Sequence, residues 1–232
     1  DLAGPLQLAR LLDGLLVGVD GQGAALRRAG DLTLAEFDRA LAGLFAALFG
    51  DLVECHVVCA RCGEGGELSF SLAEFAGSVV ESAREAAVAV AGPDDAGVYS
   101  TGEGARFRLP TVSDLAAASG EADPVAALGR RCVVGGEADA GVEAAMAAIA
   151  PLLESEIETE CVACGADNAT RFAIGDFLAA ALRRERPIVL REIHTLARAY
   201  AWSRGEIVAL PRAVRREHVA LILADSDGEG GL

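Results

Sequence analysis

The chain has 232 residues, and its 35 acidic residues outnumber its 20 basic ones, which gives a formal net charge of −15. Such an acidic balance argues against nucleic acid as a partner. No apolar run reaches the ~18 residues that a membrane span requires, so we expect no membrane partner. Hydrophobic residues make up 52% of the chain and aromatic residues only 5%, which favours helices packed through small side chains. No secretion signal is visible, and we therefore expect a cytoplasmic protein.

In chain order, the first half of the sequence predicts helices and short strands. A Ser or Thr followed three residues later by Glu or Asp signals a helix start. Alternating apolar and polar residues predict strands. These signals give an N-terminal helical segment at 1–32, a helix opened by Thr33 and Glu36 and running through Phe49, strands at 51–59 and 68–72, a helix opened by Ser71 and Glu74, a hairpin turn at 102–104, an edge strand at 106–110, a helix opened by Thr111 and Asp114, and a loop at 134–141.

The second half repeats part of this pattern and then becomes helical. Residues 155–161 and 170–174 are predicted strands. A helical pattern follows from 176 to 200, and Pro187 must either kink this helix or divide it into two. Beyond it, Ser203 and Glu206 open another helix, residues 212–224 form the last one, and residues 225–232 form a disordered acidic tail.

Two segments of the sequence match without a gap at an offset of 102 residues. Cys59–Gly63 (CARCG) aligns with Cys161–Gly165 (CVACG). Each segment reads as strand, CxxCG turn, strand and helix start, so the chain contains an internal duplication. The matching pairs beyond the turns are Phe70 with Phe172, Leu72 with Ile174, Glu74 with Asp176, and Phe75 with Phe177.

The two CxxC turns predict a metal site. Thiolates at this spacing are typical ligands of structural zinc, and one turn supplies only two of the four ligands required. We therefore predict that the halves of the chain meet around one structural Zn²⁺. The glycine after each turn allows a tight bend, and Arg61 is placed to offset part of the thiolate charge. The predicted ligands are Cys59, Cys62, Cys161 and Cys164.

A site closed by four thiolates leaves no position for water or substrate, so we expect no enzyme and no small-molecule substrate. Two alternatives remain open: a thiol-redox enzyme that uses a CxxC pair, and cysteines that only pack in the core. Cys55 and His56 read as strand residues, Cys132 as a buried small residue, and His194 as a core or surface residue of a helix.

These features predict an α+β protein, mainly helical, in which two small β half-ribbons come together around one zinc. Residues 33–224 would form a single domain made of two pseudo-repeats, at about 33–135 and 136–224.

The segment 178–216 is basic, with nine arginines against three glutamates. It is either a solvated helical face or a docking surface for an acidic partner. The two aromatic residues near its centre either anchor that partner or pack the helical core. The candidate partner-binding residues are Arg183, Arg184, Arg191, Arg198, Tyr200 and Trp202.

Two further blocks carry a resemblance to a known family. Residues 190–222, LREIHTLARAYAWSRGEIVALPRAVRREHVALI, resemble the C-terminal signature of the T-even-phage-type baseplate hub assembly proteins, often labelled hub assembly chaperones. Residues 107–117, FRLPTVSDLAA, resemble the central motif of that family, and the CxxCG turns look like those of its bacterial members. Ala201 departs from the pattern, because glycine is expected before Trp202, and this puts the turn between two helices in doubt.

The resemblance implies a non-enzymatic assembly factor of a phage tail or a phage-like contractile injection system. Its partners would be hub, spike or wedge proteins of the baseplate. A permanent structural component of the baseplate is the alternative within the same family.

Overall fold

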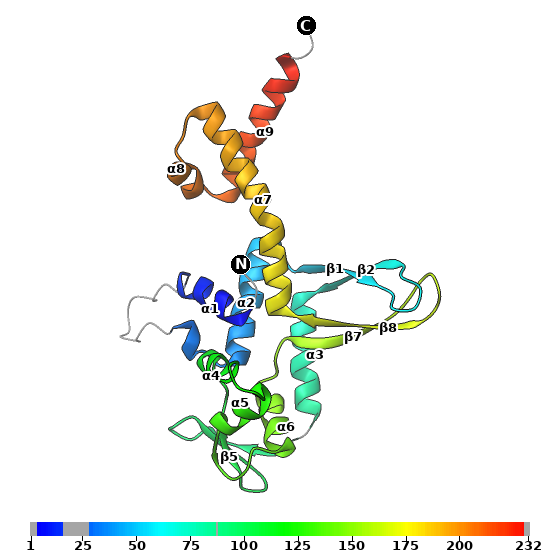
Figure 1. Ribbon diagram of the computed structural model, residues 1–232, viewed down its shortest axis with the longest axis vertical. Coiled ribbons are helices and arrows are strands. Elements are labelled where there is room, and N and C mark those ends of the chain that lie inside the picture. Colours follow the sequence, from blue (N-terminus) through cyan, green and yellow to red (C-terminus); the bar gives the residue numbers. More distant parts are fainter. Residues whose placement is uncertain (1–3, 16–27, 87, 230–232) are drawn as a thin grey trace. The chain divides into compact units, whose positions relative to one another are not determined.

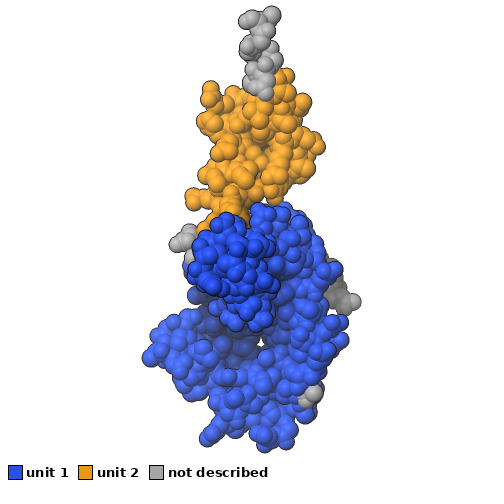
Figure 2. Space-filling model, turned by 90° about the vertical axis from the view of Figure 1, so that its right-hand side faces the viewer, with its two compact units in different colours: residues 1–179 blue, residues 180–232 orange. Residues whose placement is uncertain are grey.

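The computed structural model describes residues 4–15, 28–86 and 88–229, except for the side chains of 226–229. It is an α+β protein, as the sequence predicts. The chain divides into two compact units, residues 1–179 (unit 1) and residues 180–232 (unit 2), coloured separately in Figure 2. No helix in the described ranges combines the length and the apolar character needed to cross a membrane.

Unit 1 contains two β-ribbons, a small sheet and several helices, and the tips of both ribbons project away from the helices (Figure 1). The first part of unit 1 ends with the helix that follows the first ribbon. It consists of α1 (Pro5–Asp13), the 3-10 helix η1 (Ala29–Asp31), α2 (Leu34–Phe49), β1 (Leu52–Val58), β2 (Gly65–Ser71) and α3 (Leu72–Glu85). The small sheet and its helices are β3 (Val90–Ala91), β4 (Val98–Thr101), β5 (Arg106–Arg108), α4 (Val112–Ala118), α5 (Pro124–Cys132), β6 (Val133–Gly135) and α6 (Ala140–Ile149). The second ribbon consists of β7 (Glu154–Glu160) and β8 (Asp167–Ala173), and α7 (Ile174–Tyr200) follows it.

Unit 2 is helical and consists of the C-terminal part of α7, then α8 (Arg204–Ala209) and α9 (Arg212–Glu229). The helix α7 is continuous through Pro187, so the alternative of two helices divided at that proline is wrong. The prediction that residues 225–232 are disordered is wrong for residues 225–229, because α9 extends to Glu229. Residues 230–232 lie outside the described residues.

The predicted edge strand at 106–110 is a central strand instead. The small sheet has the antiparallel order β3-β4-β5-β6, which places β5 between β4 and β6. Local sequence features indicate that a segment is a strand, but they do not show how many neighbouring strands will pair with it. The core of this sheet is Phe107 with Val142 and Ala145 of α6. The predicted loop at 134–141 contains the end of β6 and the start of α6.

The division into units differs from the predicted boundary between pseudo-repeats at 135/136. Both ribbons, and therefore both thiol turns, belong to unit 1. The predicted N-terminal segment 1–32 joins the same unit, because α1 buries Leu8 and Leu12. Leu8 of α1 and Leu41 of α2 approach within 3.6 and 3.7 Å of the position that a Cβ would take on Gly175. Residues 1–3 and 16–27 of that segment lie outside the described residues.

The helix starts follow the predicted capping chemistry. Thr33 Oγ1 accepts from the Glu36 N–H at 3.2 Å, and Glu36 Oε2 accepts from the Thr33 N–H at 2.9 Å. The same reciprocal pair occurs at Thr111 and Asp114 and at Ser203 and Glu206, while Ser71 caps α3 by accepting from the Glu74 N–H. Each such cap satisfies backbone donors that the first turn of a helix leaves without a partner.

Asp114 does more than cap α4, because its buried carboxylate is also the centre of a partly buried ion pair. Arg108 binds both of its carboxylate oxygens, at 2.5 and 2.8 Å, and continues to the carbonyl oxygen of Arg131 at 3.1 Å. The Arg108 guanidinium, opposed by burial and assisted by the Thr111 N–H, holds the pKa of Asp114 far below its usual range. This pair therefore ties the end of β5 to α4 and α5.

A chain of phenylalanine rings joins the two ribbons to the helices of unit 1. The rings of Phe70 (β2) and Phe172 (β8) meet edge to face, with their centroids 5.2 Å apart. The ring centroid of Phe75 (α3) lies 5.0 Å from that of Phe172. Phe177, at the start of α7, then lies 5.7 Å from Phe172 and 5.3 Å from Phe45 of α2. Such pairs contribute about 0.5–1.5 kcal/mol each beyond their area, so the duplicated residues form one shared core.

Unit 2 is held by ion pairs between α7 and α9. Glu192, 6% exposed, accepts from Arg215 and Arg216, in each case at 3.2 Å. Glu185 accepts from Arg212 at 2.6 Å and from Arg216 at 3.0 Å. Three of the nine arginines in the basic segment are thus used inside the unit, which also buries Leu196 and Ile207.

Asp38 of α2 is a half-buried acid that weakens unit 1 at neutral pH. Its carboxylate accepts from the Leu153 N–H at 2.9 Å. Burial raises the pKa of Asp38 from 3.8 to about 6; the Leu153 bond lowers it, and the Glu154 charge adds to the rise. Because the folded state holds the proton more tightly than the unfolded chain, stability falls as pH rises from 3.8 towards 6 and the loss is complete above that pH.

We predict that Asp38→Asn stabilises the protein at neutral pH. An asparagine oxygen still accepts from Leu153, but no charge is buried. The gain in the free energy of unfolding should be about 1–2 kcal/mol larger at pH 7.5 than at pH 5. Chemical denaturation of both proteins across this range measures it, with the exposed Asp95→Asn as the control that should show no pH-dependent gain. An equal effect of D38N at both pH values would contradict the assignment.

Ala201 is strained by its backbone conformation. It follows α7 with φ of 56°, and it is the only residue other than glycine with positive φ in the described part of the chain. The left-handed region costs an ordinary residue about 1–2 kcal/mol. This is the position at which the resemblance to the hub assembly proteins implies glycine.

We predict that Ala201→Gly stabilises unit 2 by about 0.5–1 kcal/mol, since relief of strain exceeds the extra entropy of glycine in the unfolded chain. Ala199→Gly, at an exposed position inside α7, is the matched control and should destabilise by about 1 kcal/mol. Hydrogen exchange of α8 and α9 amides reports the stability of this unit. Slower exchange in A201G and faster exchange in A199G is the expected pair of results.

Candidate metal centre

The two ribbons have the same register. In the first, Leu52 lies opposite Ser71 and Val58 opposite Gly65. In the second, the pairs run from Glu154 opposite Ala173 to Glu160 opposite Asp167, which are the same positions advanced by 102 residues. Even the bond that leads into the following helix is repeated, from the Leu72 N–H to Asp51 and from the Ile174 N–H to Leu153. The duplication in the sequence is therefore a duplication of backbone geometry.

Each ribbon ends in a thiol turn that its own backbone closes. The Cys59 N–H donates to the Glu64 oxygen and the Gly63 N–H to the Cys59 oxygen, both at 2.9 Å. Gly63 and Gly165 have φ of 75° and 64°, a left-handed conformation that glycine adopts without strain. The second turn repeats both bonds at 2.9 and 2.8 Å, from Cys161 to Ala166 and from Gly165 to Cys161.

The turns bring four sulfur atoms together from the two ends of unit 1. Cys59 Sγ lies 3.7 Å from Cys164 Sγ, and Cys62 Sγ lies 3.7 Å from Cys161 Sγ. All four sulfurs lie within 4.8 Å of one another, so they could hold a metal ion. The two 3.7 Å pairs exchange when the repeats are exchanged, which shows an approximate twofold relation. A disulfide would need ~2.05 Å between sulfurs, and the four cysteines are free.

Asn168 joins the two turns without being part of the cluster. Its side-chain amide donates to the Val58 oxygen at 3.4 Å, and its Oδ1 accepts from the Ala60 N–H at 3.4 Å. The corresponding position of the first ribbon is Gly66, so this contact breaks the symmetry. No pattern in the sequence indicated it, because its partner atoms are backbone atoms 108 and 110 residues away.

The thiols influence one another's ionisation. Backbone N–H groups of Cys62 and Arg61 lower the pKa of Cys59 to about 6. The Ala166 N–H also favours ionised Cys164, but the crowding by Cys62 and the other thiols raises its pKa to about 12. The same competition, between the Glu64 N–H and neighbouring thiols, raises the pKa of Cys62. Four thiolates in this space repel one another, and a bound cation removes the conflict.

The residues near the turns take the places that the sequence indicated, with one difference. Cys55 and His56 lie in β1 and outside the cluster, and the His56 ring covers Gly65 on the neighbouring strand. Cys132 is buried at the end of α5. Arg61 is exposed, and it is the backbone N–H of this residue that acts on Cys59.

The candidate partner-binding arginines lie together on one surface of unit 2. Arg183, Arg191 and Arg198 are exposed, and their spacing of eight and seven residues places them on one face of α7. Arg184 is exposed beside them, as is His194, so His194 is a helix-surface residue. We call this surface, Arg183, Arg184, Arg191 and Arg198, the arginine face.

Tyr200 and Trp202 pack within unit 2. Their rings lie 4.7 Å apart, and the His218 ring of α9 contacts them edge to face at 5.5 and 5.3 Å. Both rings therefore pack against other residues of unit 2, as one of the two interpretations predicts, although Tyr200 remains 38% exposed. The part played by His218 was missed, since only the fold brings α9 back to the end of α7.

No protein-family model, curated protein or solved structure matches this chain.

We predict that Cys62→Ser and Cys164→Ser, which are related by the duplication, have equal effects. Each should abolish the binding of one divalent metal ion per chain and lower the free energy of unfolding by more than about 3 kcal/mol, because one ligand from either turn opens the site. The matched control is Cys55→Ser, which should keep the metal. Elemental analysis and thermal unfolding measure both quantities. This site would be ruled out if C55S also lost the metal, or if both C62S and C164S retained it.

Proposed function

We propose that the four-cysteine cluster is a structural zinc site. A regular tetrahedron with Zn–S bonds of ~2.3 Å has sulfur–sulfur edges of ~3.8 Å, and the two shortest sulfur pairs measure 3.7 Å. Four soft ligands in two CxxC turns favour zinc over the hard cations Mg²⁺ and Ca²⁺, which take oxygen ligands. The match of sulfur spacing is the observation that supports this proposal most directly.

The role of the ion is to join the two repeats. A site with four protein ligands has no open coordination position, which supports a structural and non-enzymatic role. Zinc binding in small peptides contributes about 10–16 kcal/mol, comparable with the whole stability of a domain at about 5–15 kcal/mol. The redox alternative is less well supported, because each CxxC pair lies within 4.8 Å of the other pair and forms a four-sulfur cluster with it.

We infer that the protein acts in the assembly of a baseplate hub in a phage tail or phage-like contractile injection system. The resemblance supports this inference, and its most specific block, residues 190–222, lies entirely within unit 2. The arginine face lies in or beside that block. Arg212, Arg215 and Arg216 of the basic segment are engaged by Glu185 and Glu192, whereas the residues of the arginine face are exposed.

The proposed partner surface is acidic, and belongs to a hub, spike or wedge protein. Arginine is frequent among the residues that dominate interface energies, and charge complementarity sets specificity and association rate. A permanent baseplate component would use the same arginine face. The two roles differ in whether the protein is present in stoichiometric amounts in purified particles.

We predict that Arg191→Glu combined with Arg198→Glu prevents capture of a hub, spike or wedge protein from a host that produces such particles. Arg204→Glu is the control, because Arg204 is exposed in the same unit but lies on α8. Quantitative mass spectrometry of the captured proteins should show at least a tenfold loss for the double variant only, with metal content unchanged. Normal contractile particles after deletion of the gene would contradict the assembly role.

A further inference from the structure

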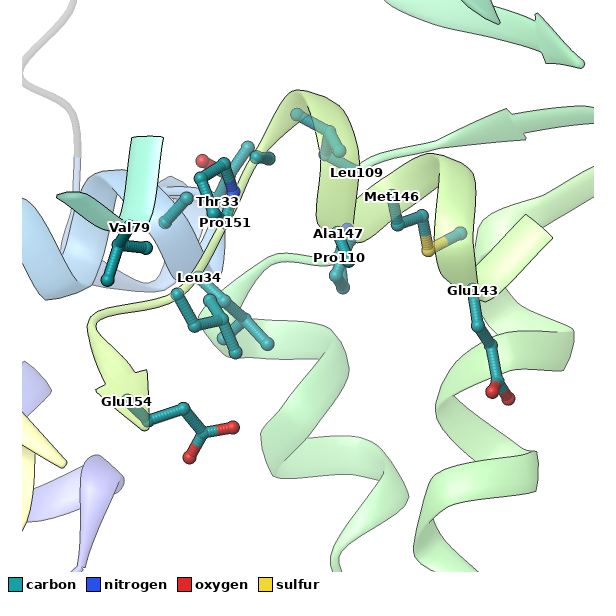
Figure 3. A pocket seen from close by; sticks show the side chains of 13 residues that line it. Thr33, Leu34, Val79, Leu109, Pro110, Glu143, Met146, Ala147, Pro151 and Glu154 are labelled. Carbon is teal, nitrogen blue, oxygen red and sulfur yellow. The ribbon is translucent and has the colours of Figure 1, made fainter. Parts of the chain in front are cut away.

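Unit 1 contains an apolar groove that is separate from the thiol turns. It has a volume of about 430 Å³ and lies where the start of α2, the segment between β5 and α4, and α6 with the segment that follows it approach one another (Figure 3). Its walls include Leu34, Leu109, Pro110, Ala147 and Pro151. The volume lies in the range of binding sites, about 300–1,000 Å³.

The groove exists because α6 has two apolar faces. Val142 and Ala145 point into the core of the small sheet, with Phe107. Ala147 and Ala150, on another side of the helix, line the groove together with Glu143. The small alanine side chains would let a second chain approach α6 closely.

Backbone bonds join two of the walls and hold them in place. The Leu34 N–H donates to the Pro110 oxygen at 2.9 Å, and the Val112 N–H donates to the Leu32 oxygen at 3.0 Å. The capping pairs at the starts of α2 and α4 fix the same two segments. The groove is thus preformed, which lowers the entropic cost of filling it.

The charges around the groove define what fits it. Glu143 lies at one end and Glu154 at the other (Figure 3), and no arginine or histidine lines the groove. Glu154 pairs with Arg171 at 2.7 Å, whereas Glu143 has no ion pair among the described residues. Residues 1–179 also hold 28 acidic residues against eleven arginines, a net charge of −17. A fatty acid or an acidic peptide would be repelled here.

We propose that this groove binds an apolar segment of a partner protein that carries an arginine or lysine beside its apolar side chains, with the cation at Glu143. An amphipathic helix or turn presents such a combination, and helix-in-groove recognition uses apolar anchors of this kind. This inference is independent of the proposed function, since it uses neither the arginine face nor the hub resemblance.

The test uses the full chain with its metal and a displayed library of random 12-residue peptides. Peptides are selected on the wild type and counter-selected on Ala147→Trp, whose indole fills the groove. Ala144→Trp, at an exposed position of α6 that does not line the groove, is the matched control. Metal content and thermal unfolding of both variants verify that the fold is retained.

The expected result is a set of peptides that combine two or three apolar residues with Arg or Lys, bind A144W like the wild type and bind A147W at least tenfold more weakly. Glu143→Gln should weaken these peptides two- to tenfold and reduce their salt dependence, whereas Glu158→Gln, on β7, should not. Enrichment of acidic peptides, equal loss in A144W and A147W, or absence of any peptide that discriminates A147W would overturn the proposal. So would a dimer of the chain that A147W dissociates, because a second copy would then be the occupant.

Discussion

The crowding of four thiols between the two ribbons is the constraint on which the proposed site of unit 1 depends, because a cation would remove the mutual repulsion of their thiolates. Sulfur atoms within 4.8 Å of one another cannot all carry charge without compensation. Each pair of cysteines sits at the tip of a two-stranded ribbon, and a single ribbon of this size is marginal by itself in water. The ribbons gain stability by sharing phenylalanine rings at one end and, in our proposal, a metal ion at the other.

The duplication shows where the two halves of the chain have diverged. Register, turn bonds and helix entry are repeated at an offset of 102 residues, but the helices that follow differ in length. The helix α3 has 14 residues, whereas α7 has 27 and continues into unit 2. Arg191 and Arg198 lie on this extension, whereas Arg183 and Arg184 lie on the part of α7 that corresponds to α3. The block that resembles the hub assembly proteins begins on the extension and continues through α8 into α9. The repeated part of the chain thus builds the scaffold, and the proposed partner surface spans the end of the repeat and the extension of α7.

Local signals allowed the ribbons, the four helix caps and the cysteine cluster to be predicted from the sequence. A CxxCG turn, a Thr–x–x–Glu start and an alternating strand each depend on neighbours within a few residues. The errors concern non-local properties: β5 gained a second neighbouring strand, α7 continued through Pro187, and α9 extended to Glu229. Asn168, His218 and the groove could not have been predicted either, because their contacts join segments that only the fold brings together.

The position of the groove in the chain links it to the thiol turns. Pro110, Ala147 and Pro151 lie among the 98 residues between Cys62 and Cys161, whereas Leu34 lies outside that loop. Closing a loop of this length restricts the unfolded chain by about 4–5 kcal/mol if the estimate for disulfides applies. Release of the metal would therefore lower the stability of unit 1 as a whole, and with it the population of chains in which the groove is formed. Because linkage is reciprocal, a partner that fills the groove and bridges its two walls would in turn strengthen retention of the metal. In our proposal, a single ion would in this way stabilise the ribbons and, through the stability of the whole unit, the groove.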